Sequence, residues 1–394
     1  MRSHRRWILT GPNDLERSAP QWPATVVCVS KSHSRDEVAF AATALTSGFP
    51  HHGMVPATCC EVPGSSLHRE AMWEWLCSPA IQHPSGHCLS WVGTRQTGYP
   101  YPEVTGLLLT LLATRESGKS RAGVLAGALF ADPQSAVGVG RASIGYTFDT
   151  AMAVRGLLLH PDVLSPDQFR TVARWCEFLL AQVASAAALV PGSCVKLPAR
   201  WSNSFGAHQS KVAGALLAYR EIFPERRRQV GAALEGLGRR TLLSQTGDGR
   251  FLESVTSTAT YLHAHCYALE GLLMQRSAGS GDYSSQVDKG MEWLASVQDA
   301  SGGIRAWHDG VRSMGPMRLD ATAQAVRLFR LTNSIRYEAN IRLGVRYLLD
   351  HQNELGGMPY EPSSPDLNTW ATIFAFQAVT DDLLSGGETW AHLV

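Results

Sequence analysis

The segment KGMEWLASVQDASGGIRAW, residues 289–307, decides the fold prediction. It contains an amphipathic helical run that ends in a glutamine, then a turn with two glycines, and then an aromatic residue. The same order occurs in GVRYLLDHQNELGGMPY, residues 344–360, and in RRTLLSQTGDGRF, residues 239–251. The three glutamines are Gln245, Gln298 and Gln352. They are separated by 53 and 54 residues, and a repeat of this length indicates helical units that cover one another's apolar faces.

Runs of small and apolar residues lie between these copies, and none of them contains an internal proline. The six runs are residues 103–113, 149–159, 207–219, 260–274, 320–331 and 368–379. Because they are apolar on most faces, we expect them to be buried all round, while the amphipathic runs form an outer layer. Six inner and six outer helices that alternate along the chain predict an all-α fold, an (α/α)6 toroid or barrel, over residues 66–394.

Residues 1–65 have a different pattern. ATVVCVS, residues 24–30, is typical of a strand, and SRDEVAFAATALTSG, residues 34–48, is typical of a helix that begins at a serine cap. We therefore predict a small N-terminal α/β appendage, and a protein partner could bind to it.

Composition excludes several classes of partner. The 394 residues carry a formal net charge of +1, so nucleic acid is not an expected partner. No apolar run reaches the roughly 20 residues that a membrane span needs. The basic N-terminus has too short an apolar stretch for a signal peptide. Eight cysteines without a CxxC motif are typical of reduced thiols, so we predict a cytoplasmic location.

Two inner runs begin alike, since both read T-A-x-A-V-R from Thr150 and Thr322, and an aspartate precedes each, Asp149 and Asp320. In a toroid the inner helices start at one mouth, where each helix end carries about half a positive charge and unpaired N–H groups. We therefore expect a site at this mouth that binds anions. The polar residues expected there are Glu103, Asp149, His208, Tyr261, His263, His265, Asp320, Asn368 and Trp370.

These residues receive separate predicted roles. Asp320 and Glu103 act as acid and base, and Asp149 orients the substrate. His265 and Tyr261 assist them, because they are four residues apart and share a helix face. The residues predicted to bind substrate or an anion are His208, Lys211, Arg318, Arg200, Trp370 and His263. Asp149, Asp320 and Asn368 are also good helix caps, and Glu103 suits a first turn, so a structural role is the alternative for each.

No metal and no cofactor are predicted. The run YLHAHCY, residues 261–267, is rich in potential ligands, but His263 and His265 point to different helix faces. His263 and Cys266 are an i, i+3 pair that could face one ion, so zinc is the alternative. Motifs for nucleotide binding, serine hydrolysis and zinc proteases are absent from the sequence.

The stretch at 289–307 resembles the QW repeat of the terpenoid cyclase and prenyltransferase toroid superfamily, in which the glutamine and the aromatic residue tie an outer helix to its neighbour. DTAMA, residues 149–153, is similar to the end of the D-x-D-D-T-A motif of proton-initiated terpene cyclases. In that alignment the proton donor falls on Phe148 and the first aspartate on Tyr146. The resemblance therefore implies the toroid fold over residues 68–380, without the family's proton donor. Protein prenyltransferases of the superfamily bind zinc through Asp, Cys and His, so the resemblance implies that Asp320 could complete a zinc set with Cys266 and His263.

Three functions follow as hypotheses. The first is a cyclase or lyase of a specialised biosynthetic pathway, in which acid/base groups assist ring closure or elimination and the mouth holds a sulfate- or phosphate-type leaving group, as in aziridine formation. The second is a carbohydrate-active enzyme, such as a uronate lyase, a glycosidase or an epimerase, with paired carboxylates and aromatic side chains around a sugar. The third is a terpene-cyclase-like protein or a non-catalytic partner subunit. We favour the first, with a small anionic substrate.

Overall fold

A computed structural model describes residues 65–96, 98–131, 135–136, 139–140, 146–187, 201–202, 206–380 and 393–394. Residues 57–394 belong to one compact unit. The predicted N-terminal appendage and its partner fall outside the described residues, apart from Ser65, which begins the first helix.

Twelve α-helices form the described part, and they alternate between an outer and an inner position. The outer helices are α1 (Ser65–Cys77), α3 (Lys119–Ala131), α5 (Pro166–Ala187), α7 (Arg227–Leu242), α9 (Ser284–Ser296) and α11 (Glu338–Asp350). The inner helices are α2 (Pro102–Leu112), α4 (Thr147–Leu158), α6 (Ala213–Ile222) with the preceding 3-10 turn η6 (Ala207–Val212), α8 (Leu262–Ser277), α10 (Leu319–Asn333) and α12 (Thr369–Val379). Nearly every described residue of the inner helices is buried, which explains their apolar sequences.

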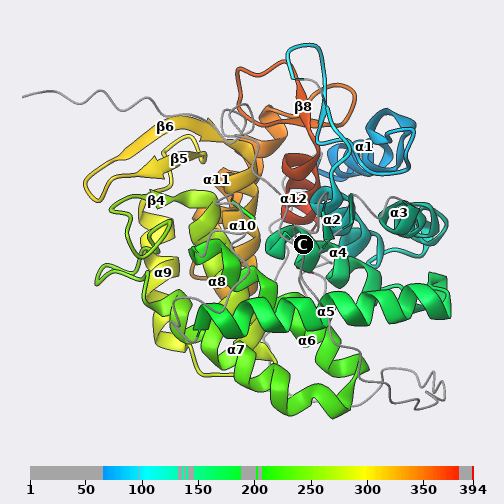
Figure 1. Cartoon of the computed structure of the whole chain (residues 1–394). Coiled ribbons are helices and arrows are strands. Elements are labelled where there is room, and N and C mark those ends of the chain that lie inside the picture. The colour runs from blue at the N-terminus through cyan, green and yellow to red at the C-terminus, as the bar shows by residue number, and fades with distance from the viewer. Residues whose placement is uncertain are drawn as a thin grey trace, which may run out of the picture. The chain divides into compact units, whose positions relative to one another are not determined.

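The inner helices close into a ring. Each contacts the next in the order α2, α4, α6, α8, α10 and α12, and α12 in turn contacts α2. Figure 1 shows the outer helices around them. The toroid prediction is therefore confirmed. None of the described helices is both long and apolar enough to cross a membrane.

Three glutamines make the same pair of hydrogen bonds at the ends of outer helices. Gln298, after α9, donates its side-chain amide to the carbonyl of Gly302 (2.8 Å) and to that of Asn340 in α11 (3.1 Å). Gln245 and Gln352 do the same after α7 and α11. Each side chain thus closes its own turn and ties that turn to the next outer helix. For Gln352 the next helix is α1, so this contact closes the outer layer.

A threonine in the first turn of an inner helix anchors the preceding turn. Thr322 Oγ1 in α10 accepts the N–H of Ile304 (2.9 Å), two residues after Gly302. Thr372 in α12 accepts the N–H of Met358 in the same way. Thr322, the threonine of the second T-A-x-A-V-R copy, therefore makes a structural contact between a turn and a helix.

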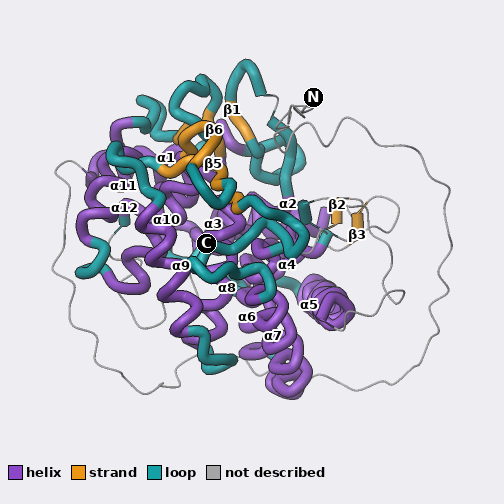
Figure 2. Tube along the Cα trace, turned by 90° about the vertical axis from the view of Figure 1, so that its left-hand side faces the viewer, coloured by secondary structure: helices purple, strands orange, loops and turns teal. Residues whose placement is uncertain are grey.

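Short strands lie beside several inner helix starts, although the sequence indicated almost none after residue 65. They form antiparallel sheets of β1 (Trp91–Val92), β8 (Leu367–Asn368) and β7 (Met358–Pro359), and of β4 (Thr260–Tyr261), β5 (Ile304–His308) and β6 (Ser313–Arg318). A separate pair consists of β2 (Ser135–Ala136) and β3 (Val139–Gly140). In Figure 2 strands β1, β5 and β6 gather at the upper end of the helices. β4, β6 and β8 directly precede α8, α10 and α12, so they mark the end of the ring where these helices begin.

Candidate functional site

The carboxyl groups of Glu103 and Asp149 lie in the first turns of two adjacent inner helices, α2 and α4. Both residues are buried. The two helices meet backbone to backbone, because a Cβ on Gly106 would lie only 2.5 Å from the Cα of Ala153. This close approach brings the carboxyl groups near enough for the charge of Asp149 to act on Glu103. We call these two residues the carboxyl pair.

Glu103 has an environment that favours its protonated form. Burial raises the pKa of Glu103 to about 8, and the charge of Asp149 adds to the rise, while hydrogen bonds from Trp370 and Tyr101 oppose it. Trp370 donates its indole N–H to Glu103 Oε1 over 3.0 Å. The ring of Tyr101 lies 5.3 Å from that of Trp370. Glu103 is therefore a carboxylic acid near neutral pH, held between two aromatic side chains.

Asp320, in the first turn of α10, has the opposite environment. Burial alone would raise its pKa, but the charge of Arg318, with a contribution from His263, holds the pKa of Asp320 below its ordinary value. Arg318 Nε donates to Asp320 Oδ1 over 3.2 Å, and His263 Nδ1 lies 3.3 Å from Oδ2. Arg318 also lies over the ring of Tyr360 and 3.7 Å from Glu361 Oε1. Asp320 is thus a carboxylate, and two acids share the charge of Arg318.

Tyr261 joins this group through aromatic contacts. Its hydroxyl lies 3.3 Å from that of Tyr360, and its ring stacks on Trp307 with the centroids 4.6 Å apart. Trp201 meets the ring of Tyr261 edge-on at 5.8 Å. Burial raises the pKa of Tyr261 to about 12, so its hydroxyl stays protonated. Trp201, Trp307 and Tyr360 are half-buried, and all three contact Tyr261.

Tyr267 packs between Phe148, which precedes Asp149, and His263, which lies beside Asp320, although the sequence did not single it out as a site residue. It is fully buried, its ring meets His263 at 4.4 Å and Phe148 at 5.1 Å, and its hydroxyl has no hydrogen-bond partner in the described parts of the chain. Burial raises the pKa of Tyr267, and the charges of Glu103, Glu270 and Asp320 raise it further, while that of Arg327 opposes the rise. In the sequence, the spacing of four residues from His263 indicates that Tyr267 and His263 lie on the same face of one helix. Phe148, which aligns with the proton donor of terpene cyclases, is packed against this ring.

Two of the predicted histidines are committed to the backbone. His265 Nδ1 accepts the N–H of Phe251 (3.1 Å), which is the same contact between a turn and a helix that Thr322 makes in α10 and Thr372 makes in α12. His265 Nε2 lies 3.2 Å from the carbonyl of Gly290. His208 stacks on Trp201 at 3.8 Å and contacts its carbonyl through Nε2. Burial lowers the pKa of each histidine to about 3. Both are therefore neutral, and the structure does not bring His265 to the carboxyl pair or to Asp320.

The predicted cations Arg318 and Lys211 belong to different inner helices and have different acidic partners, and Arg318 lies at the start of α10. Lys211, in η6, is fully buried and forms an ion pair with Glu270 of α8, eight residues past the helix start. Arg318 is shared by Asp320 and Glu361, and Arg200 lies outside the described residues. Acidic side chains, those of Glu103, Asp149 and Asp320, also lie at these helix starts, and anion binding there stays a prediction.

The zinc alternative has no geometric support in the described residues, where no group of three His, Cys, Asp or Glu side chains is close enough to hold a metal ion. Cys266 is fully buried, and burial raises its pKa well above the ordinary value, which disfavours the thiolate that zinc needs.

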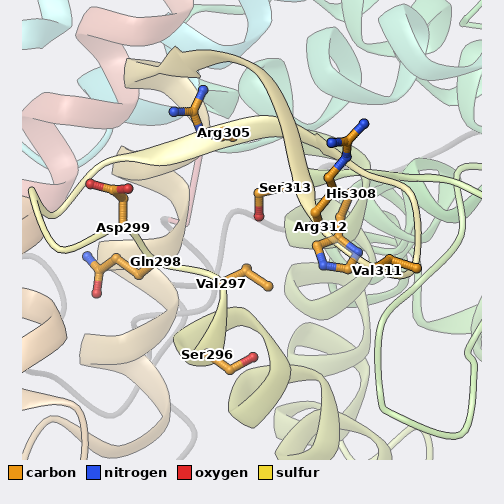
Figure 3. A pocket seen from close by; sticks show the side chains of 9 residues that line it. All are labelled: Ser296, Val297, Gln298, Asp299, Arg305, His308, Val311, Arg312 and Ser313. Carbon is orange, nitrogen blue, oxygen red and sulfur yellow. The ribbon is translucent and has the colours of Figure 1, made fainter.

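A pocket of about 290 Å³ lies elsewhere, between the end of α9 and the hairpin of β5 and β6 (Figure 3). It is lined by Ser296, Val297, Gln298, Asp299, Arg305, His308, Val311, Arg312 and Ser313. Arg305 donates to the carbonyl of Gly315, and Arg312 pairs with Asp309, so the cations of this pocket already have partners.

Solved structures with a similar fold include glucuronyl hydrolases and type II terpene cyclases. The unsaturated glucuronyl hydrolase from Bacillus sp. GL1 has a TM-score of 0.55 and 13% identity, over 80% of this chain and 94% of that one. A possible member of the GH105 family from Salmonella enterica has a TM-score of 0.59 and 10% identity, over 83% and 96%. The type II terpene cyclase MstE from Scytonema has a TM-score of 0.52 and 16% identity, over 80% and 96%.

No family model matches the sequence, and no curated protein matches it either. At identities this low the likeness shows the fold alone. The chain thus has the α/α-toroid fold that glucuronyl hydrolases of this kind and type II terpene cyclases also have.

Proposed function

We propose that this chain is an enzyme that donates a proton from Glu103 to a small-molecule substrate and stabilises the positive charge that follows. A carboxyl group with a pKa of about 8 is protonated near neutral pH and can still release its proton near that pH, as a general acid requires. Asp149 and Asp320 place negative charge beside the proton donor. The observation that carries the proposal is the buried carboxyl pair, in which the charge of Asp149 and burial together keep Glu103 protonated.

A carbohydrate-type substrate fits these groups best. Cleavage at a glycosidic carbon passes through an oxocarbenium-like transition state, for which two carboxyl groups serve as acid and as base or nucleophile. Half-buried rings beside the acids, those of Tyr101, Trp370 and Tyr360, can stack on sugar rings and favour positive charge. Glucuronyl hydrolases with the same fold support this class. We therefore favour a carbohydrate-active hydrolase or lyase.

A cyclase of alkene substrates is the second candidate. It is favoured by the aromatic layer below the carboxyl pair, where Phe148, Tyr267 and Phe374 pack together and can stabilise a carbocation. In this reaction Glu103 would supply the proton that the aligned position, Phe148, cannot supply.

An elimination that releases sulfate or phosphate, such as aziridine formation, has less support. It requires a cation at the leaving group, whereas Arg318 is shared by two acids and Lys211 is paired with Glu270. The acids at the helix starts favour a substrate that gains positive charge, not one that expels an anion.

The test is a substrate panel with matched variants. Aryl glycosides and aryl uronides, together with unsaturated uronides, are assayed for product release, and linear polyprenyl alkenes are assayed for cyclic products by mass spectrometry. We expect glycoside or uronide turnover, and Glu103→Gln should lower kcat by about 10²–10⁴-fold, the range typical of a general acid. Glu354→Gln, at an exposed position, is the control. Full turnover by Glu103→Gln would contradict the proposal, and cyclic products alone would favour the second candidate.

A further inference from the structure

The two hydrogen-bond partners of Glu103 differ in what they can do. Trp370 donates its indole N–H to Glu103 Oε1 over 3.0 Å, and Tyr101 also forms a hydrogen bond with this carboxyl group. An indole N–H is a donor only, whereas a phenol hydroxyl can donate or accept. The better acceptor of a protonated carboxyl group is its carbonyl oxygen. The contact with Trp370 therefore makes Oε1 the carbonyl oxygen and places the proton on Oε2.

One segment of the chain holds the starts of both helices that bring the indole and the acid together. Tyr101, the residue before α2, donates its main-chain N–H to the carbonyl of Cys88 over 2.9 Å. Thr369, the first residue of α12, donates its hydroxyl to the carbonyl of Leu89 over 2.6 Å. Trp370 is the next residue of α12. The contact between indole and carboxyl group is thus fixed by the backbone of two consecutive residues.

The hydrogen bond from Trp370 becomes stronger when the proton leaves Glu103. A hydrogen bond to an ionised acceptor is roughly twice as strong as one between neutral groups. Burial and the charge of Asp149 raise the pKa of Glu103, and the hydrogen bonds of Trp370 and Tyr101 lower it. The charge of Glu103 in turn acts on Tyr267 of α8. Trp370 therefore holds the acid in place and also stabilises the carboxylate that remains after proton transfer.

We propose that Trp370 is a positioning residue for Glu103, which holds Oε1 so that Oε2 carries the proton and releases it to the substrate. This inference rests on the reaction proposed at Glu103. With a glycoside, the Oε2–H bond breaks, its electrons stay on Oε2, and the proton passes to the glycosidic oxygen. The bond between that oxygen and the glycosidic carbon breaks with its electrons on the oxygen. Water then supplies the hydroxyl group for the carbon and the proton that restores Glu103.

Infrared difference spectra test this contact without a substrate. The carbonyl stretch of a protonated carboxyl group falls in wavenumber when its carbonyl oxygen accepts a hydrogen bond. Between pH 6 and pH 10 the unaltered chain should lose such a band with a midpoint near pH 8, and Glu103→Gln should lack it. In Trp370→Phe the band should move to higher wavenumber and persist to higher pH. Trp175→Phe is the control, because this tryptophan stacks on Phe130 between outer helices, and it should leave the band unchanged.

A band that stays in place in Trp370→Phe would overturn the proposal, because the indole would then not hold the carbonyl oxygen. With a substrate that the chain turns over, Trp370→Phe should lower kcat by about tenfold or more and move the alkaline limb of the rate profile to higher pH. A lower kcat with an unmoved limb means a packing defect and also overturns it. If no substrate is turned over, the proposed reaction fails, and the infrared spectra still decide the contact.

Discussion

The raised pKa of Glu103 affects both the proposed proton transfer and the stability of the fold. The pKa of Glu103 is about 8 in the folded chain, against 4.5 for the free side chain. The folded state therefore holds this proton more tightly than the unfolded state does, and the stabilisation from the bound proton is complete below pH 4.5 and lost as pH rises through about 8. Glu103→Gln removes this dependence. We expect the variant to gain stability relative to the unaltered chain from pH 5 to pH 8, by at most about 1.4 kcal/mol per pH unit.

Urea unfolding at pH 5, 6, 7 and 8 measures this difference. Glu354→Gln is exposed and should shift the free energy of unfolding equally at every pH. A constant difference between Glu103→Gln and the unaltered chain would show that Glu103 ionises normally and is not the proton donor.

His265 shows how a residue type can mislead. We expect His265→Leu to destabilise the fold by about 1–3 kcal/mol, because the buried N–H of Phe251 loses its acceptor. His265→Thr restores an acceptor of the kind found in α10 and α12, so it should cost less. The folded fraction of either variant should keep its kcat. A loss of kcat without a loss of stability would show that His265 has the catalytic role predicted from the sequence.

The sequence identified residue types at the helix starts but not their orientation. Glu103, Asp149, His263, Arg318 and Asp320 were all predicted near one end of the ring, and the structure places them at the starts of inner helices. Their pairing was not predictable, because it depends on helix rotation and on contacts between segments far apart in sequence. Tyr101 and Tyr360 were not predicted for this reason. In the sequence each is an aromatic residue in a turn, and its contact with Trp370 or Arg318 depends on the position of α12 or α10.

At the level of elements, the Gln–Gly turn is a close contact between outer helices. Gly302 has φ +95°, and a Cβ there would lie 2.2 Å from the carbonyl oxygen of Leu343 in α11. Gly302→Ala therefore combines a disfavoured backbone conformation with a clash against backbone, and we expect a loss of more than about 1 kcal/mol. Gly127→Ala in α3, where a Cβ meets nothing, should instead gain about 0.5–1 kcal/mol. Thermal unfolding compares the two, and equal effects would contradict this account of the turn.

The inner helices were predictable within a few residues because their apolar runs have clear ends. The run at 320–331 became α10 (Leu319–Asn333), and that at 368–379 became α12 (Thr369–Val379). The strands β5 and β6 were not predictable. β6 contains a glycine and a proline, both poor strand formers, and pairing with β5 rather than local preference holds it in place.

At the scale of the whole ring, acidic and basic side chains of the described residues follow an order along two inner helices. Asp149 and Asp320 lie in the first turns of α4 and α10, where the positive helix ends favour them, and Arg155 and Arg327 lie further along the same helices. The sequence predicts that those same helix ends attract an anionic substrate, and no contact in the structure tests this prediction. The chain's own carboxyl groups lie in this field, and for this reason we propose a substrate that becomes positive.

Closure of the ring gives the last prediction. Gln298 connects α9 with α11, the next outer helix along the chain. Gln352 connects α11, the last outer helix, with α1, the first, and so joins segments that are 284 residues apart. In an open stack of helices α1 would be a frayed end, so Gln352→Leu would cost less than Gln298→Leu. In a closed ring the two contacts are equivalent, and each loss of two hydrogen bonds should cost a similar amount, about 1–3 kcal/mol. Urea unfolding of both variants decides between these arrangements, because a clearly smaller cost for Gln352→Leu means that α1 detaches before the ring unfolds.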